Sequence, residues 1–512
     1  MLTKILSAAH FGLETTPIEV EVNIAKKGFP GFTIIGLPSK SVEEAKERVK
    51  TALVNSEVDF PNAKITVNLA PADIPKEGSN YDLPIAIGIL ASLEAVRLPE
   101  GKSYFYGELS LDGKLRHTRG VFLLALSAKK NGVKRVFVPA ASAKEASVVA
   151  GVRVYPVVAL EQVIGHLNGV SKIQKLKDSK RLKLQTGEQL VEFDFNEIIG
   201  QEQAKRAMEI AAAGGHNIFM QGPPGSGKTM LARALAGVLP PLSLEESLEV
   251  TKVYSVTGNI EPGEALVTAR PFRVSHHTTS RIGLIGGGSN PHPGEISLAH
   301  NGVLFLDEFP EFSRSTLESL RQPMEDGVVT VTRAAGSVEF PARFMLVAAS
   351  NPCPCGYLGD TKRACKCSPR MIMRYQSKLS GPIMDRVDLH INVPAVDVEK
   401  LMPRAGKIRK HESSSVIRER VLRARKVAQK RFSGEGIYIN AAMKNKHVKK
   451  YVKIKPEAMV VLKQAVSAYG LSARTYFRVI KVSQTIADLA GESVIKAEHV
   501  AEALQYRVRS GD

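Results

Sequence analysis

Eight consecutive residues match in full a pattern that binds nucleotide phosphates, G-x-x-x-x-G-K-[ST]. They are Gly222, Pro223, Pro224, Gly225, Ser226, Gly227, Lys228 and Thr229. An apolar run precedes this P-loop and apolar residues at helical spacing follow it, which is the strand, loop and helix that the motif needs. The loop N–H groups would surround the β-phosphate, Lys228 would reach the β- and γ-phosphates, and Thr229 would bind Mg²⁺. The motif therefore predicts a site for a nucleoside triphosphate and Mg²⁺.

Two carboxylates further along the chain offer groups for hydrolysis. Residues 303–306 form an unbroken apolar run, typical of a strand buried on both faces, and Asp307 and Glu308 follow it directly. Ligands of open parallel sheets bind at the carboxyl ends of strands. Asp307 suits the Mg²⁺ shell, and Glu308 suits the base that orients and deprotonates the attacking water. Together with the P-loop, this pair predicts an ATPase with ATP and Mg²⁺ as its cofactors.

Three further side chains are candidates for roles in the reaction or in ligand binding. An apolar strand ends just before Asn351, which would lie beside Glu308 and orient the attacking water. Arg386 is placed to act as a finger on a neighbour's γ-phosphate, with a surface salt bridge as the alternative. Arg333 lies near the tip of a hairpin predicted over 327–344. There it is either simply solvated or, in the pore of a ring, in contact with the phosphate backbone of DNA.

The segment between the two ATPase motifs carries a glycine-rich run at 282–295, which predicts a mobile inserted loop that grips the substrate. His276 and His277 precede it. Because adjacent residues of a strand point to opposite faces, these histidines do not favour a metal site.

Length and composition set broad limits. At 512 residues the chain is too long for one hydrophobic core, so two or three domains are expected. No apolar run approaches the roughly 18 residues of a membrane helix. The short apolar stretch at the N-terminus is soon followed by Glu14, which argues against a signal peptide. A cytoplasmic protein without membrane contact is predicted.

Positive charge is concentrated in one region. The net charge is +19, and the segment from Arg404 to Lys455 holds 17 lysines and arginines against three acids, a net charge of +14. Such a run forms either a solvated basic face or a surface for a polyanion. In an ATPase we favour DNA, bound through its phosphates without sequence preference.

All four cysteines of the chain lie close together: Cys353, Cys355, Cys365 and Cys367. Two C-x-C pairs do not suggest disulfides in a cytosolic protein. Four thiolates can form a closed, structural zinc site, and four free thiols are the alternative. A metal here would fix a loop and take no part in the chemistry.

The pattern of elements predicts an α/β protein of three domains. Alternating apolar residues and amphipathic helices indicate an α/β domain over 1–168, followed by a basic linker at 169–188. An ATPase core with a parallel sheet is expected over 189–400, and a helical lid over 401–512.

The first domain resembles the proteolytic domain of Lon proteases. The resemblance rests on Pro-Lys-Glu-Gly78, Gly-Glu-Leu-Ser-Leu-Asp-Gly-Lys114 and Val-Phe-Val-Pro139. Lon proteases use a serine and a lysine, in which the amine activates the hydroxyl. Here the nucleophile position falls on Asn80, with Ser79 one residue early, and the lysine position falls near Phe122. A domain that cannot cleave peptides, and that serves oligomerisation or binding, is implied.

Taken over most of its length, the chain resembles the YifB/ComM family of magnesium chelatase-like AAA+ ATPases. The resemblance rests on the P-loop, His-His-Thr-Thr-Ser280, Pro-Gly-Glu-Ile-Ser-Leu-Ala-His300, Gly-Val-Leu-Phe-Leu-Asp-Glu308, Asn-Pro-Cys-Pro-Cys-Gly356 and Ser-Gly-Pro-Ile-Met-Asp-Arg386. The domain order agrees as well.

This resemblance implies a role for each motif. Asp307 and Glu308 would be Walker B, Asn351 sensor 1 and Arg386 the trans finger. Arg474 looks like sensor 2, which couples the lid to the γ-phosphate. Residues Ile199 and Gly200 resemble the adenine-contacting segment of AAA+ proteins, although a simple helix start explains them equally well. A hexameric ring is implied, and the ComM branch is associated with branch migration in natural transformation.

Three functions follow as hypotheses. The leading one is a hexameric DNA motor, a helicase or branch-migration factor in recombination or natural transformation. A chelatase-type motor that remodels a protein partner is the alternative. An unfoldase or protease of the Lon type is the third, and the missing dyad argues against proteolysis.

Overall fold

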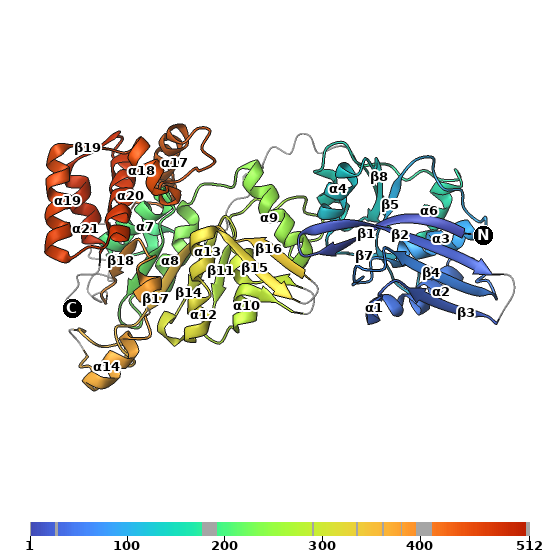
Figure 1. The fold of residues 1–512 in the computed structure, drawn as a ribbon, viewed down its shortest axis with the longest axis horizontal. Coiled ribbons are helices and arrows are strands. Elements are labelled where there is room, and N and C mark those ends of the chain that lie inside the picture. The colour runs from blue at the N-terminus through green and yellow to red at the C-terminus, as the bar shows by residue number, and fades with distance from the viewer. Residues whose placement is uncertain are drawn as a thin grey trace, which may run out of the picture.

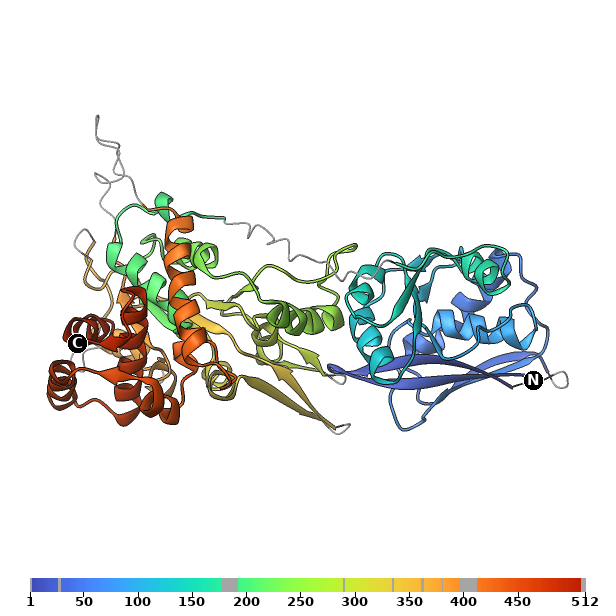
Figure 2. The ribbon, with the colours of Figure 1, turned by 90° about the horizontal axis from the view of Figure 1, so that it is seen from above.

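The described chain is elongated, and its parts follow one another along the long axis (Figure 1). A computed structural model describes residues 2–25, 29–176, 192–288, 291–333, 336–360, 363–379, 381–395 and 412–507. We call residues 2–176 the N-terminal unit; it lies at one end, the C-terminal helices lie at the other, and a second view shows the same order (Figure 2). None of the described helices is long and apolar enough to cross a bilayer.

The N-terminal unit is built on a seven-stranded sheet in the order β3-β4-β2-β1-β5-β8-β9. Its long antiparallel strands alternate buried and exposed side chains because one face meets the core and the other meets solvent. The strands are β1 (Leu2–Phe11), β2 (Glu14–Ala25), β3 (Gly31–Ile35), β4 (Lys64–Ala70), β5 (Ser103–Phe105), β8 (Arg135–Pro139) and β9 (Arg153–Val157). The helices are α1 (Lys40–Glu43), α2 (Ala45–Asn55), α3 (Asp82–Ser92), α4 (Val121–Lys130), α5 (Ala143–Ser147) and α6 (Leu160–Leu167), with a small hairpin β6 (Glu108–Leu109) and β7 (Leu115–Arg116).

Part of the predicted linker packs on this unit. The Leu176 N–H donates to the Val154 carbonyl at 2.9 Å, and Ile173 packs against the core of the unit. The rest of the predicted linker, 177–188, lies outside the described residues, as does the predicted boundary at 400/401.

A five-stranded, all-parallel sheet forms the centre of the chain, in the order β11-β14-β17-β10-β18. Helices cover both faces of such a sheet, which is why β14 and β17 are buried throughout and read as apolar runs. The strands are β10 (Ile218–Gln221), β11 (Phe272–Ser275), β14 (Val303–Leu306), β17 (Met345–Ser350) and β18 (Leu389–Asn392). The main helices are α7 (Glu202–Gly214), α8 (Lys228–Val238) and α9 (Leu244–Thr257). The predicted α/β fold with a parallel sheet is confirmed.

Short elements are inserted around this sheet. The predicted hairpin is present as β15 (Val328–Arg333) and β16 (Gly336–Pro341), and it extends toward the N-terminal unit (Figure 1). The glycine-rich insert forms α10 (Arg281–Ile285), the paired β12 (Gly286–Gly287) and β13 (His292–Pro293), and α11 (Glu295–Leu298). The others are η1 (Phe195–Glu197), η2 (Phe309–Glu311), α12 (Arg314–Glu318), α13 (Arg321–Asp326), α14 (Pro369–Gln376) and α15 (Gly381–Met384).

The C-terminal part is helical, as predicted, and it packs directly on the central unit that holds the parallel sheet. Ile417 and Val421 of α17 share one hydrophobic cluster with Leu231 and Leu235 of α8, and Val482 of α20 belongs to it as well. The elements are α17 (Ser414–Arg431), η3 (Asn440–Ala442), α18 (Asn445–Tyr451), α19 (Pro456–Tyr469), α20 (Ala473–Leu489) and α21 (Ala497–Gln505), with the pair β19 (Lys453–Ile454) and β20 (Val494–Ile495).

Much of the charge of α17 is used inside the protein. The Arg418 Nε donates to the Gly237 carbonyl at 2.7 Å, Arg420 binds Glu412 and Glu209, and Arg431 binds Asp488. Arg423, Lys426 and Lys430 stay exposed and, at a spacing of three and four residues, share one face of the helix. On α17 the exposed basic face is therefore narrower than the sequence suggests, while the first part of the predicted basic segment, 404–411, lies outside the described residues.

Helix α9 links the parts of the molecule. At one end the Gly120 N–H donates to the Ser255 carbonyl at 2.9 Å, and the Ser255 hydroxyl donates to Glu145 of the N-terminal unit at 2.9 Å. Burial raises the pKa of Glu145 to about 7. The N-terminus of α9 has a capping box, in which the side chains of Ser243 and Glu246 accept hydrogen bonds from each other's backbone N–H groups.

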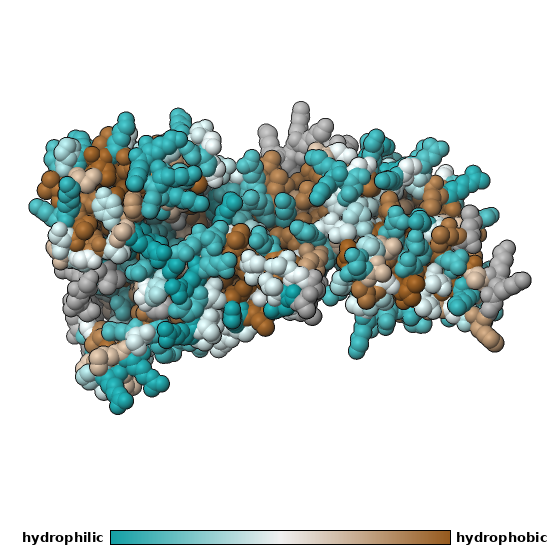
Figure 3. Space-filling model, viewed as in Figure 1, coloured by the Kyte–Doolittle hydropathy of each residue, from teal (hydrophilic) through white to brown (hydrophobic). Residues whose placement is uncertain are grey.

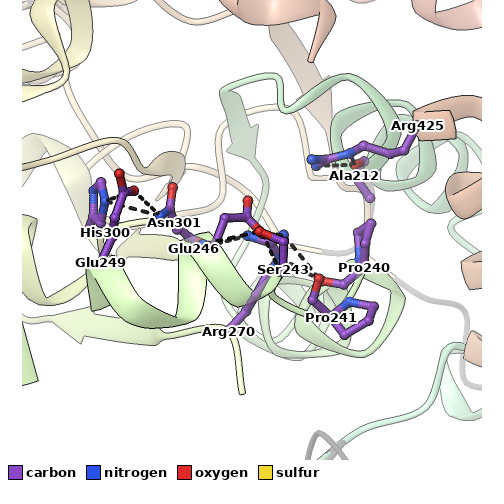
Figure 4. Close-up of polar contacts among 10 residues, drawn as sticks. All are labelled: Ala212, Pro240, Pro241, Ser243, Glu246, Glu249, Arg270, His300, Asn301 and Arg425. Carbon is purple, nitrogen blue, oxygen red and sulfur yellow. Dashed lines mark hydrogen bonds and ion pairs between the residues drawn. The ribbon is translucent and has the colours of Figure 1, made fainter. Parts of the chain in front are cut away.

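A polar network holds α9 against the segments that lead into β11 and β14 (Figure 4). The Arg270 side chain, which is only 8% exposed, donates to the Pro240 and Asn301 carbonyls and to Glu246, the last at 2.8 Å. Glu249 accepts from His300 at 3.1 Å and from Asn301 at 3.0 Å. The bond from His300 is the main reason why the pKa of Glu249 falls to about 2. Because this value is below the ordinary one of 4.5, the contact stabilises the fold above about pH 4.5 and is lost as the pH falls toward 2.

A substitution of Arg270 tests this network. Arg270→Ala is expected to lower the stability of the central unit by about 2–4 kcal/mol, because two carbonyls and one carboxylate lose their donor. The core transition in differential scanning calorimetry should fall by about 5–10 °C. Arg281→Ala, at the exposed start of α10, is the matched control and should leave the transition within about 1–2 °C of the unmodified chain. Equal transitions for both variants would contradict a stabilising role of Arg270.

Candidate active site

The P-loop lies between β10 and α8, at the carboxyl end of the central sheet. Gly227, which caps α8, has φ of +90°, a backbone conformation that side chains with a Cβ rarely adopt. Gly222 has no room for a side chain, since a Cβ there would lie 2.1 Å from the Val393 carbonyl oxygen. The glycines of the motif are therefore required by the backbone path that turns N–H groups toward a phosphate.

One pocket of about 500 Å³ gathers the residues singled out in the sequence. Its lining consists of Pro224, Gly225, Ser226, Gly227, Lys228, Thr229 and Met230 of the P-loop and α8, together with Phe193, Arg233, Asp307, Glu308 and Asn351. The carboxyl ends of β10, β14 and β17 thus meet at one edge of the sheet, where ligands of parallel sheets bind.

Lys228 is held by its own loop. Its Nζ donates to the Gly222 carbonyl at 2.7 Å and the Pro223 carbonyl at 2.8 Å, and it lies 3.3 Å from the Asn351 Oδ1. Burial lowers the pKa of this amine, and the nearby Asp307 carboxylate opposes the shift. A phosphate would have to replace the two carbonyls as the partner of the ammonium group.

Thr229 and Asp307 form an oxygen pair at the edge of the pocket. The Thr229 hydroxyl donates to the Asp307 Oδ2 at 3.1 Å, and the Glu308 N–H donates to the Asp307 Oδ1 at 2.9 Å. Mg²⁺ binds hard oxygen ligands in octahedral geometry and takes the remainder from water and phosphate. The hydroxyl and the carboxylate suit this ion and would hold it beside the phosphates.

Glu308 has an unusual backbone and an unforeseen partner. Its φ is +50° and its ψ is 45°, a left-handed conformation that costs a residue with a side chain about 1 kcal/mol or more. Its carboxylate lies 2.9 Å from the Nδ1 of His277, which follows β11, the neighbour of β14 in the sheet. Spacing in the sequence does not reveal this contact, because His277 and Glu308 are 31 positions apart. His277, which the sequence suggested only as an unfavourable metal ligand, instead contacts a residue of the pocket lining.

Removing His277 should free the Glu308 carboxylate. His277→Ala is expected to raise ATP turnover measured without DNA by up to about fivefold, because a contact between two exposed polar side chains restrains them by about 0.2–1 kcal/mol. Steady-state phosphate release gives the rate, and His276→Ala, which alters the preceding residue, is the control. A fall in kcat with unchanged KM would mean instead that His277 positions Glu308 for the reaction.

The segment predicted to contact adenine lies beside the P-loop. Gly200 and Gln201 have left-handed backbones, with φ of +71° and +59°. The Gln201 side chain donates to the Pro394 carbonyl at 2.6 Å and to the Ser226 carbonyl at 3.4 Å. Ile199 is not part of the pocket lining described above, whereas Phe193 is. The adenine role of Ile199 and Gly200 stays a prediction.

The two arginines predicted to sense phosphate meet each other away from this pocket. Arg386 and Arg474 both bind the Glu325 carboxylate, Arg474 at 3.0 Å. Arg386 is buried, and its Nε has no partner among the described residues, whereas half of the Arg474 side chain is exposed. Neither lines the P-loop pocket, so any phosphate that they contact would be on another subunit or would require a movement of the lid.

Arg333 is exposed and bridges the two inserts. Its Nε donates to the Gly288 carbonyl at 3.1 Å, so the hairpin and the glycine-rich insert touch. At its other side the hairpin approaches the N-terminal unit, where Gly12 lies against Val338. The four cysteines, by contrast, converge just beyond Asn351.

The positions expected from the Lon resemblance hold other contacts. Ser79 binds Glu108, the buried Asn80 lies 3.5 Å from the Ala8 carbonyl, and Phe122 is fully buried in the core of the unit. None of these contacts brings an amine to Ser79.

Comparison with known proteins gives matches along nearly the whole chain. Residues 194–401 match the family described as "Magnesium chelatase, subunit ChlI", residues 20–142 match "Subunit ChlI of Mg-chelatase", and residues 411–507 match "Magnesium chelatase, subunit ChlI C-terminal". The chain is 43% identical over 507 residues to competence protein ComM of Haemophilus influenzae, which covers 99% of this chain and 97% of that protein.

Two further relatives frame this result. Protein YifB of Escherichia coli is 41% identical over 512 residues, 99% of this chain and 97% of that protein. The magnesium-chelatase 38 kDa subunit of Cereibacter sphaeroides is 30% identical over 176 residues, 31% of this chain and 53% of that protein. The ComM and YifB proteins thus match this chain along nearly its whole length, whereas the magnesium-chelatase subunit matches about a third of it.

Proposed function

The chain belongs to the YifB/ComM family of magnesium chelatase-like AAA+ ATPases, and we propose that it is a DNA motor driven by ATP hydrolysis. The observation that carries the proposal is the meeting of Lys228, Thr229, Asp307, Glu308 and Asn351 around one pocket. We place the motor in the cytoplasm, which holds both ATP and the chromosome.

Each side chain of the pocket has a task in this mechanism. Lys228 leaves its two carbonyls for the β- and γ-phosphates, and Asn351, 3.3 Å away, orients the attacking water. Glu308 accepts the proton of that water. Bound by Thr229 and Asp307, Mg²⁺ would neutralise charge on the phosphates. Phosphoryl transfer needs little more than such positioning and charge stabilisation.

A ring supplies what this pocket lacks. Negative charge develops on the γ-phosphate in the transition state. Two cations of the described chain line the pocket: Lys228, at the start of α8, and Arg233, further along this helix. In the proposed hexamer Arg386 of the adjacent subunit reaches the γ-phosphate, and Arg474 reports the same phosphate to the lid.

The proposed path of DNA follows two basic features. Arg423, Lys426 and Lys430 form one exposed face of α17. Around the position of this helix, hydrophilic residues predominate on the side of the molecule that Figure 3 shows. Arg333 adds an exposed cation on the hairpin. Such groups contact phosphates and give affinity without sequence preference. One relative is named a competence protein, which supports a DNA-related role, and we propose branch migration as the activity.

The test is ATP-dependent strand displacement on forked, three-stranded and four-way DNA, together with the ATPase rate with and without DNA. Arg423→Glu/Lys426→Glu/Lys430→Glu is expected to weaken DNA binding by about 10- to 100-fold and to lower the salt slope by about 3. Lys129→Glu/Lys130→Glu/Lys134→Glu makes the same change in net charge on the N-terminal unit and should have a much smaller effect. An ATPase rate that no DNA alters, with no strand displacement, would refute the DNA motor.

That negative result would favour a second function, a chelatase-type motor that remodels a protein partner. The observation behind it is the similarity to the magnesium-chelatase 38 kDa subunit, which extends over about a third of this chain. A partner isolated with the Glu308→Gln variant in ATP, and released on ATP removal, would support it.

A further inference from the structure

The four cysteines of the chain converge on one point. Each offers a sulfur atom, and all four sulfurs lie within 4.8 Å of one another. The Cys353 Sγ lies 3.4 Å from that of Cys355 and 3.7 Å from that of Cys365, and the Cys355 and Cys365 sulfurs are 3.6 Å apart. A tetrahedral zinc ion with Zn–S bonds of about 2.3 Å needs sulfurs about 3.8 Å apart. The cluster is therefore close to a zinc geometry, and none of the four cysteines is in a disulfide.

Two separate segments build the cluster. Cys353 and Cys355 follow β17 directly, whereas Cys365 and Cys367 precede α14. The Cys355 N–H donates to the Cys367 sulfur and the Cys367 N–H to the Cys365 sulfur, both at 3.4 Å. Backbone donors of this kind stabilise thiolates that bind a metal. Cys353 is fully buried, so the first segment anchors the cluster in the protein.

We propose that Cys353, Cys355, Cys365 and Cys367 bind one structural zinc ion, and that this ion holds the end of β17 against the P-loop. Four protein ligands leave no open position, so the ion takes no part in hydrolysis. The ion would link the segment that follows β17 to the segment that precedes α14, and it would thereby fix the turn that follows Asn351.

The contact between that turn and the P-loop is tight. Gly356 donates its N–H to the Cys353 carbonyl at 2.9 Å and has φ of +84°. A Cβ on Gly356 would lie 2.5 Å from the Pro224 Cδ of the P-loop and 3.8 Å from the Asn351 Cγ. Asn351 in turn contacts Lys228. A bound zinc would thus set the positions of both Asn351 and Pro224, a part of the proposal that rests on the proposed ATPase, whereas metal binding itself does not.

Metal analysis of the full-length chain tests the site. Inductively coupled plasma mass spectrometry after dialysis should give about one zinc per chain for the unmodified protein and for Lys366→Ala, an exposed residue between two ligands. Cys365→Ser/Cys367→Ser should contain almost none. Because the chain has only four cysteines, thiol titration reports this site alone: native protein should react slowly and metal-free protein at four positions.

A measurement on the unmodified chain guards against misfolded variants. After zinc removal, added Co²⁺ should give the thiolate charge-transfer and visible bands of a tetrahedral four-sulfur site, and Zn²⁺ should displace them. Protein that contains no zinc, gives no cobalt spectrum and has four reactive thiols in its native state would overturn the proposal. So would iron in place of zinc.

The proposed effect of zinc on the P-loop is tested by the binding of a fluorescent ATP analogue. Cys365→Ser/Cys367→Ser is expected to bind it about tenfold more weakly than Lys366→Ala, whose affinity should equal that of the unmodified chain. If the double cysteine variant lost zinc but bound the analogue as tightly as Lys366→Ala, the proposal that zinc positions the P-loop would be overturned. Zinc at one per chain in a protein without DNA-dependent ATPase would overturn the proposed function and leave the metal site intact, so the two failures are distinguishable.

Discussion

Replacing Glu308 with glutamine is expected to preserve ATP binding and to slow hydrolysis by about 10²- to 10⁴-fold, because the amide accepts no proton from the attacking water. Thr229, Asp307 and Lys228, which would hold the nucleotide and Mg²⁺, are unchanged in this variant. The contact between the Thr229 hydroxyl and the Asp307 carboxylate at 3.1 Å does not involve the Glu308 side chain. KM should therefore change little while kcat falls, and a nucleotide-bound protein should accumulate.

Single-turnover hydrolysis of radiolabelled ATP separates these steps. Glu311→Gln is the matched control, since this carboxylate lies three residues further on, is bound by Lys378 at 2.9 Å and does not line the pocket. Its rate should stay within about twofold of the unmodified chain. Full activity in Glu308→Gln, or a loss of ATP binding equal to the loss of turnover, would contradict the role of this residue as the base.

The residues of the pocket could be predicted because their signals are local. A P-loop is a continuous motif, and the strands that end at Asp307 and Asn351 are apolar runs because the sheet is covered on both faces. Parallel strands must present their carboxyl ends at one edge, so two runs and one loop were enough to place these side chains together.

Other features depend on tertiary contacts that no spacing reveals. His277 meets Glu308 because β11 pairs with β14, an order that the sequence does not give. The arginines of α17 suggest a basic surface in the sequence, yet Arg425 is only partly exposed and donates twice to the Ala212 carbonyl, and burial lowers its pKa to about 9. Charge composition alone cannot separate an arginine that binds a ligand from one that joins two helices.

The convergence of Arg386 and Arg474 on Glu325 is also a tertiary contact that spacing in the sequence does not reveal. Within one chain Glu325 holds Arg386 away from the P-loop pocket. If the finger acts on a neighbour, Arg386→Ala should lower kcat by about 10³-fold or more while ATP still binds. If the salt bridge between Arg386 and Glu325 is purely structural, Glu325→Gln and Arg386→Ala should have the same effect, a loss of stability.

Mixing two inactive variants decides between these roles. In a head-to-tail ring, an Arg386→Ala subunit retains Glu308 and its Glu308→Gln neighbour supplies Arg386, so one intact site forms where they meet in this order. With random assembly from equal amounts, about one quarter of the sites should be complete, and ATPase activity should reappear on mixing. Arg321→Ala, at an exposed arginine bound to Glu318, is the control for loss of a surface pair and should remain active alone. Mixtures that stay as inactive as their components, although both variants assemble and bind ATP, would show that Arg386 does not complete a neighbour's site.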